Sequence, residues 1–377
     1  MTRRLLRICV AGALGILAAG CGALLRPQTP AELRAALAAR VLPGTADTLV
    51  IPFEVSEGDV ARAQEAVGGH ATTSDRTSAL FDALFAESGF GLRYVPVVTA
   101  SARDALDHHE GNCLTLASVF VGLARGVGLD AYYMDASRRI GEVETDDEVI
   151  VNMGHITAAV DTERGTLAMD FGWDLPRGNY YRRIDDVEAV AHFYNNRGFE
   201  RLDDAMRRGQ ALDWTSAGRD FTVATEVMPD FSRGWNNLGI ANARLGNREE
   251  AERDYARAIS IEPSFAAPRT NLGVLALRDG RVETALARFD DAVRAEPKNA
   301  RAHYHRGVAL LRLDRPAEAA TAFARAVALE PDFPRARTML DRAQAQIASP
   351  SAPGTATGPA PGVGAGNRPD PGPRTAP

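Results

Sequence analysis

The chain has 377 residues, of which 45% are hydrophobic and 24% charged, and its formal net charge is −6. These values exclude a largely disordered chain and leave room for two domains with separate cores. Residues 1–20 hold three arginines and no acidic residue, so a chain lacking them carries a charge of −9. This acidic body argues against nucleic acid as a partner.

Residues 1–20 predict a signal peptide for export. Their sequence, MTRRLLRICVAGALGILAAG, places basic residues before an apolar run, and small residues stand directly before Cys21. The layout resembles a bacterial lipoprotein signal, although the leucine of the cleavage motif, Leu17, stands one place early. The resemblance implies that Cys21 becomes the lipidated first residue of the mature chain.

An uncleaved membrane span is the alternative, because Ile8 to Leu25 is an apolar run of 18 residues. Its four glycines and the small residues before Cys21 favour cleavage. In both cases the arginines stay on the cytoplasmic side and the body is exported. We therefore expect a protein of the bacterial cell envelope, lipid-anchored on the periplasmic or extracellular face, with residues 21–47 as anchor and linker.

Three elements are expected before residue 96. The Ala-rich stretch from 31 to 41 predicts a helix, TLVIPFEV at 48–55 is a candidate strand, and a further helix is expected near 76–87. The body holds one cysteine, Cys113, since the other two lie within the N-terminal apolar stretch. A disulfide within the folded body is thereby excluded.

Cys113 is predicted to lie at the N-terminus of a buried helix. Apolar residues recur at helical spacing after it, and the helix is expected to end near Gly126 or Gly128. Unpaired amides and the helix dipole favour a thiolate at such a position, so we expect a lowered thiol pKa and a nucleophilic sulfur. Gly111 gives the preceding turn room for a substrate to approach.

The segment 149–173 predicts two strands joined at Thr162 to Gly165. If Val160 pairs with Leu167, the residue numbers of each pair add up to 327. Asp170 then lies opposite Thr157 and diagonal to His155. The three polar residues then share one face of the hairpin. A base and its orienting carboxylate would lie side by side, as Cys-His-Asp catalysis requires.

These residues resemble the transglutaminase-like superfamily, which has a papain-like α+β fold. The resemblance consists of GNC at a helix start, an L-A-R-x-x-G-L-D-A turn into a strand, His155 at 42 residues after Cys113, and Asp170 at 15 residues after His155. It covers about residues 48–190. It implies Cys113 as nucleophile, His155 as general base and acid, and Asp170 as the orienter of the imidazole.

Two positions depart from the family pattern. Phe171 stands where a proline commonly follows the aspartate, and Thr157 stands where a tryptophan is common. The departures weaken the expectation of glutamine–lysine cross-linking and favour peptidase or amidase chemistry through a thioester. The backbone N–H of Cys113 is the expected oxyanion donor, and Asn112 and His109 are near in sequence for a second.

Each candidate also has a plain structural reading. A free cysteine is often a buried core residue, His155 could be a strand histidine with a satisfied hydrogen bond, and Asp170 could simply end a strand. The HHxxxC pattern of His108, His109 and Cys113 allows a zinc site, but no second cysteine or acidic motif supports it. We expect no metal and no cofactor.

Between residues 193 and 346 the sequence repeats at an interval of 34. The pattern resembles the tetratricopeptide repeat, a pair of antiparallel helices that stacks into a solenoid. Glycine and alanine let the two helices approach closely, the aromatic residue is expected to wedge between repeats, and proline stops the second helix. The positions carrying the pattern are Trp235, Leu238, Gly239, Ala251, Tyr255, Pro263, Gly273, Ala285, Phe289, Pro297, Gly307, Ala319, Phe323 and Pro331.

We expect about four repeats over 191–347, the first irregular and interrupted by a loop, with a cap helix at 332–346. Residues 348–377 are rich in Pro, Gly and Ala and are expected to be disordered.

The preferred interpretation is an envelope-anchored cysteine hydrolase or acyltransferase acting on a peptide or protein, with a repeat groove that recruits a protein partner. The alternative is a non-catalytic repeat scaffold lipoprotein in which the first domain is vestigial.

Overall fold

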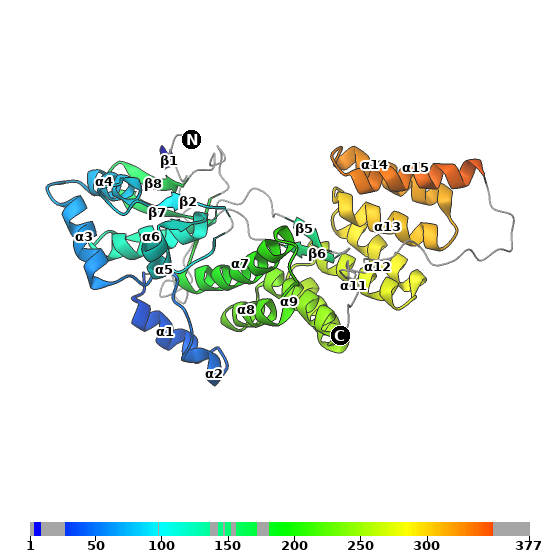
Figure 1. Ribbon diagram of the computed structural model, residues 1–377, viewed down its shortest axis with the longest axis horizontal. Coiled ribbons are helices and arrows are strands. Elements are labelled where there is room, and N and C mark those ends of the chain that lie inside the picture. Colours follow the sequence, from blue (N-terminus) through cyan, green and yellow to red (C-terminus); the bar gives the residue numbers. More distant parts are fainter. Residues whose placement is uncertain are drawn as a thin grey trace, which may run out of the picture. The chain divides into compact units, whose positions relative to one another are not determined.

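The computed structural model describes residues 4–8, 27–96, 98–135, 142–145, 148–151, 156–171 and 181–349. Residues 4–8, 142–145 and 148–151 are described by their backbone alone. Its contacts divide into two units: Met1–Val143 with Ile150–Pro263, and Glu144–Val149 with Ser264–Pro377. Figure 1 follows the elements along the chain. Cys21, His155 and the tail from residue 350 lie outside the described residues.

A five-stranded antiparallel sheet lies in the first unit, in the order β1-β8-β7-β4-β9. Its strands are β1 (Arg4–Ile8), β4 (Ala131–Asp135), β7 (Ile156–Thr162), β8 (Gly165–Asp170) and β9 (Arg182–Ile184). A short pair, β2 (Arg93–Tyr94) with β3 (Glu110–Gly111), accompanies it. Another short pair, β5 (Glu142–Thr145) with β6 (Glu148–Val151), has its residues divided between the two units.

Ten helices are described in the first unit. Several begin at a Ser, Thr, Asp or Asn whose side chain accepts the amide of the third helical residue, among them Ser56, Ser101 and Asn112. The helices are α1 (Pro30–Ala38), α2 (Pro43–Ala46), α3 (Glu57–Val67), α4 (Thr73–Phe85), α5 (Ala102–His108), α6 (Cys113–Gly126), α7 (Asp186–Arg207), α8 (Trp214–Val227), α9 (Ser232–Leu245) and α10 (Arg248–Ile261).

The helix α6 is the centre of this unit's core. Every residue from Leu114 to Ala124 is buried. The helix covers the sheet face to which Ile156, Ala158 and Val160 contribute. On its other side Gly122 passes the carbonyl of Phe53 so closely that an added Cβ would lie 2.2 Å from that oxygen. The predicted helix from Cys113 to Gly126 is confirmed.

The strand predicted at 48–55 is wrong, whereas helices are found near 31–41 and 76–87 as α1 and α4. Pro52 interrupts the segment and has no N–H to donate to a ladder. Instead, Val50 donates its N–H to the Tyr194 hydroxyl at 2.8 Å, and the Pro52 carbonyl accepts from Ala102 at 2.7 Å. The apolar side chains at 49, 51 and 53 are buried in the core as an irregular segment.

The second unit consists of helix pairs followed by a final helix. They are α11 (Ala267–Arg278), α12 (Val282–Ala295), α13 (Ala300–Arg312), α14 (Pro316–Leu329) and α15 (Pro334–Ala348), the last close to the expected cap. In the first unit, α9 and α10 form a repeat and α7 and α8 an irregular pair joined by residues 208–213. The 34-residue pattern therefore corresponds to helix pairs, as predicted.

The aromatic position of each repeat packs on the glycine of its own repeat. A Cβ at Gly239 would lie 2.7 Å from the Tyr255 ring, and one at Gly273 would lie 2.4 Å from the Phe289 ring. The aromatic residue was expected to pack between repeats, but its ring also packs within its own repeat, against the glycine. Phe289 also stacks on His305 of the next repeat, with 5.5 Å between ring centroids.

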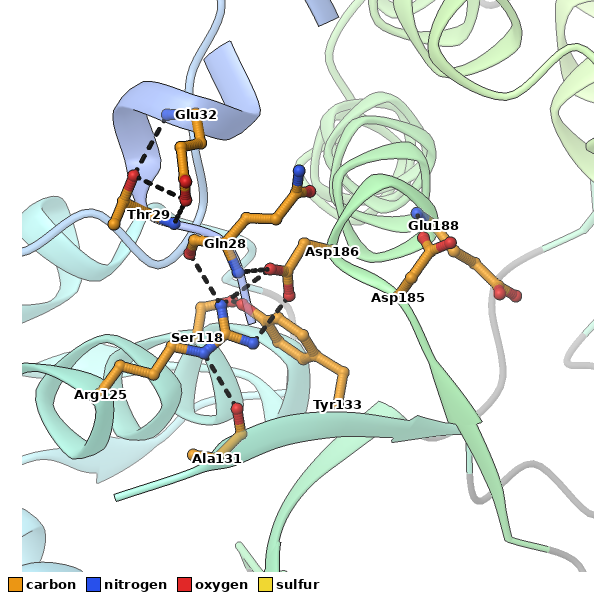
Figure 2. A network of polar contacts seen from close by, with 10 residues as sticks. All are labelled: Gln28, Thr29, Glu32, Ser118, Arg125, Ala131, Tyr133, Asp185, Asp186 and Glu188. Atoms are coloured by element: carbon orange, nitrogen blue, oxygen red, sulfur yellow. Dashed lines mark hydrogen bonds and ion pairs between the residues drawn. The ribbon is translucent and has the colours of Figure 1, made fainter. Parts of the chain in front are cut away.

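A buried ion pair ties α6 to the N-terminus of α7 (Figure 2). Two Arg125 nitrogens donate to Asp186 at 2.9 and 2.8 Å, and its Nε donates to the Ala131 carbonyl at 2.9 Å. The side chains are 13% and 5% exposed. Val190 and Phe193 of α7 belong to the same hydrophobic core as α6. The start of the repeat region is thus built into the core of the first unit.

Within the described ranges, no helix combines the length and apolar character that a membrane crossing needs. Most of the apolar run from Ile8 to Leu25 lies outside those ranges.

Replacing Gly273 by alanine should destabilise the protein, because the new methyl group meets the Phe289 ring at 2.4 Å. We expect a loss of about 1–3 kcal/mol in the free energy of unfolding, measured by urea denaturation. The control is Gly218→Ala in α8, where the nearest atom is the Ala241 Cβ at 3.4 Å. It should be neutral or stabilise by up to about 1 kcal/mol. Equal effects of the two substitutions would contradict the close-approach role.

Asp186→Asn should destabilise strongly, because it leaves the Arg125 guanidinium buried without its anionic partner. We expect a loss of about 3–5 kcal/mol in urea denaturation. Asp204→Asn on the same helix removes the exposed partner of Arg208 and should lose less than about 1 kcal/mol. A loss from Asp186→Asn as small as that of the control would show that the pair does not hold α6 to α7.

Candidate active site

Cys113 is the first residue of α6 and retains intermediate exposure. Asn112 caps the helix, since its Oδ1 accepts the amide of Thr115 at 2.9 Å. Gly111, just before it, lies so close to the Thr115 methyl group that a Cβ would be 2.3 Å from it. A glycine at this position is therefore required by the packing of the cap. The described residues contain one free thiol, and it lies where the first amides of a helix lack intrahelical partners.

The Cys113 thiol lies at the start of α6, which packs against β7. The backbone amides of Ile156, Leu114 and Cys113 favour the ionised form of the thiol and so lower its pKa. Burial nevertheless outweighs these amides and raises the pKa of the Cys113 thiol to about 11. The expected lowering of the thiol pKa is therefore wrong. The helix amides act in the predicted direction, but desolvation of the sulfur is the larger effect.

The hairpin pairs in the predicted register, with Val160 opposite Leu167 and Ala159 opposite Ala168. The Thr157 hydroxyl donates to the Met169 carbonyl, which continues that register toward Asp170. Asp170 is the last residue of β8. His155 precedes Ile156, the first residue of β7, and lies outside the described residues.

The two faces of the hairpin have different surroundings. Ile156, Ala158 and Met169 belong to the core with α6, whereas Ala159 and Ala168 form a separate cluster with Tyr132 and Met134.

The loop before α5 is held against Asn112 by a polar network. The Asn112 amide nitrogen donates to the Thr99 hydroxyl and to Glu200 Oε1, both at 2.7 Å. The second oxygen of Glu200 accepts the backbone N–H of Thr99. Both amide hydrogens of Asn112 are thus engaged in the resting protein, which excludes it as the second oxyanion donor.

Glu200 lies on α7 and was not identified from the sequence, because 88 positions separate it from Asn112. Its carboxyl group is desolvated by burial, which raises its pKa to about 7 against the opposing hydrogen bonds from Thr99 and Asn112. The charge of Glu200 in turn contributes to the raised pKa of Cys113. No sequence motif marks Glu200, which lies in the irregular first repeat.

His108 and His109 are exposed and turn to backbone carbonyls. His108 Nδ1 lies 2.8 Å from the Asp104 carbonyl, and His109 Nδ1 lies 2.8 Å from that of Phe90. His109 adopts a left-handed conformation, with φ of 59°. Among the described residues, no group of three or more His, Cys, Asp or Glu side chains is placed to hold a metal ion.

A cavity of about 480 Å³ lies at the opposite end of α6, lined by Pro27, Phe53, Gly122, Arg125 and Leu129, among others. Nine residues of helix separate Cys113 from Gly122, a rise of about 14 Å. This cavity therefore does not belong to the site at Cys113.

Comparisons with known proteins match separate parts of the chain. Residues 60–174 match the model of the transglutaminase-like superfamily, and residues 232–265 and 270–334 match tetratricopeptide repeat models. No curated protein matches the sequence.

Solved structures of repeat proteins are similar to part of the chain. MamA from Desulfovibrio magneticus is 22% identical, with 42% of this chain and 85% of that chain covered and a TM-score of 0.33. The Arabidopsis OM64 TPR domain is 27% identical, with 31% of this chain and 96% of that chain covered and a TM-score of 0.29. PilF of Pseudomonas aeruginosa is 18% identical, with 43% of this chain and 71% of that chain covered and a TM-score of 0.38. At these TM-scores none of the three defines the fold of this chain. The family matches themselves establish that the chain contains a transglutaminase-like domain followed by tetratricopeptide repeats.

Proposed function

We propose that the protein is an envelope-anchored cysteine-dependent amide hydrolase or acyltransferase of papain-like α+β fold, in which Cys113, His155 and Asp170 form the catalytic triad. The observation that carries the proposal is the packing of α6, which begins with Cys113, against β7, whose first residue Ile156 directly follows His155. The hairpin register supports it, because the same numbering relation brings Asp170 opposite Thr157. The match to a transglutaminase-like superfamily spans all three residues.

The raised thiol pKa shapes the proposed chemistry. A neutral thiol must lose its proton as it attacks, so His155 accepts the S–H proton while the sulfur bonds to the amide carbon. The protonated imidazole then donates that proton to the leaving amine as the C–N bond breaks, and a thioester remains. Water or a second amine then attacks the thioester and gives a proton to His155. As the C–S bond breaks, the acid or the new amide is released and His155 passes that proton to the Cys113 sulfur. Asp170 orients the imidazole throughout.

The N–H of Cys113 is the proposed oxyanion donor. It is the first amide of α6 and lacks an intrahelical acceptor, so it can donate to the negative oxygen that develops during attack. The helix dipole acts in the same direction.

The tetratricopeptide repeats are proposed to bind a protein or peptide partner, and Cys21 is proposed to carry the lipid that holds the chain at the envelope membrane. The helix pairs over 232–265 and 270–334 support the first part of this proposal. The small residues before Cys21 support the second part.

Cys113→Ala should abolish turnover, and His155→Ala should lower it by about 100-fold or more, since general base catalysis contributes about 10²–10⁴-fold. Dimethylcasein with dansylcadaverine reports transamidation, and new amino termini or released ammonia report hydrolysis. The matched control is His108→Ala, which removes an exposed histidine bonded to the Asp104 carbonyl and should retain full activity. Wild-type activity in Cys113→Ala would favour the non-catalytic scaffold instead.

Cys21→Ala should release the protein from the membrane fraction, because a lipoprotein is held by acyl chains at that single residue. The measurement is membrane fractionation of cells that express the full chain, with mass spectrometry of the N-terminal peptide for the lipid. Cys9→Ala is the control and should leave the protein in the membrane fraction. Unchanged partitioning of Cys21→Ala would instead support an uncleaved span.

A further inference from the structure

We propose that Glu200 of α7 is a positioning residue for the active site, whose carboxylate holds Asn112 and the loop at Thr99 in place and brings a negative charge to the start of α6, next to Cys113. The inference rests on the proposed role of Cys113. It assigns a function in the active site to a residue that lies beyond the matched transglutaminase-like segment, which ends at residue 174.

The first part of the argument is geometric. Each oxygen of the Glu200 carboxyl group accepts from a different donor, Oε1 from the Asn112 amide and Oε2 from the Thr99 backbone. Asn112 is 4% exposed and caps the helix that begins with Cys113. The carboxyl group therefore fixes the residue before the nucleophile and the loop beside it at the same time.

Thr115 completes the arrangement around the loop. Its hydroxyl donates to the Val98 carbonyl at 3.0 Å and accepts the Ala100 N–H at 2.9 Å. The backbone of the 98–100 loop is thus held from one side by α6 and from the other by α7. Of these two supports, the contact with Glu200 comes from outside the matched transglutaminase-like segment.

The second part of the argument concerns charge. Two donors and no acceptor face the Glu200 oxygens in these contacts, an arrangement that suits the carboxylate form. Because Asn112 directly precedes Cys113, its hydrogen bond with Glu200 places the negative charge at the start of α6, where it opposes ionisation of the thiol. The acidic side chain that most affects Glu200 itself is Asp203, whose own partner is Arg207 at 2.9 Å. The amides of Cys113, Leu114 and Ile156 act on the thiol in the opposite direction.

Two substitutions, Glu200→Gln and Glu200→Asp, together separate the positioning role from the effect of the charge. The glutamine amide has one acceptor oxygen, so its NH₂ group must face either the Thr99 N–H or the Asn112 NH₂, and one of the two contacts is lost. At the same time the negative charge beside the thiol disappears. Glu200→Asp keeps the charge but is one methylene shorter, and Asp204→Asn removes an exposed charge from the same helix as the matched control.

The experiment measures two quantities that do not require a substrate. Iodoacetamide labelling of the Cys113 peptide, quantified by mass spectrometry from pH 6 to about pH 11, reports shifts of the thiol pKa between variants, because the labelling rate below the pKa follows the thiolate fraction. Hydrogen exchange of the peptide containing Thr99 reports the loop. Glu200→Gln should lower the thiol pKa by about one unit and accelerate exchange by about tenfold. Glu200→Asp should accelerate exchange with an unchanged thiol pKa, and Asp204→Asn should change neither.

Turnover is the third readout. Glu200→Gln should lower kcat by about 10- to 100-fold with little change in KM, because misplacement of the nucleophile affects chemistry more than binding. A purely structural residue would accelerate exchange without lowering the thiol pKa, and that result would overturn the proposal. Unchanged exchange at Thr99 would overturn it as well. If the wild type itself lacks turnover, the proposed enzyme function fails, while the labelling and exchange data still decide the role of Glu200.

Discussion

The structure of the first unit depends on the hydrogen-bond and ion-pair partners of the polar side chains at the two ends of the buried helix α6. Asn112 caps the start of this helix, and Arg125 lies in its last turn. Both side chains bind a carboxylate of α7: Asn112 binds Glu200, and Arg125 binds Asp186. The two acids are 14 positions apart, about 21 Å of helix, which matches the length of α6. The start of α6 is therefore joined to the later part of α7, and the end of α6 is joined to the start of α7.

This arrangement explains why the environment of Cys113 differs from that of an exposed helix N-terminus. The dipole and free amides of a helix start favour a thiolate, but the enclosure that anchors α6 also removes water from the sulfur. Burial of Glu200 adds a second group whose charge opposes that of the thiolate. A thiol with a raised pKa needs a base within reach at the moment of attack. The chemistry therefore depends on a neighbouring imidazole more than the position of Cys113 alone indicates.

Much of the fold could be predicted because it follows local rules. Helix α6 follows from apolar spacing after Cys113, the hairpin register follows from the turn at Thr162 to Gly165, and the repeats follow from a fixed period. The failures arise where tertiary contacts decide. The segment 48–55 has the composition of a strand, but Pro52 and the hydroxyl of Tyr194 direct its backbone elsewhere. Glu200 has no local signal, since its role depends on a contact across 88 positions.

Helix α7 continues unbroken from Asp186 to Arg207, across the position where a boundary between the two modules was expected. The module that carries Cys113 and the irregular first repeat therefore share one continuous helix. Recombination that exchanged the array at residue 190 would bring a foreign residue into the place of Glu200 while leaving Asp186 behind. An exchange of the repeats at that position would therefore also change the surroundings of the Cys113 sulfur.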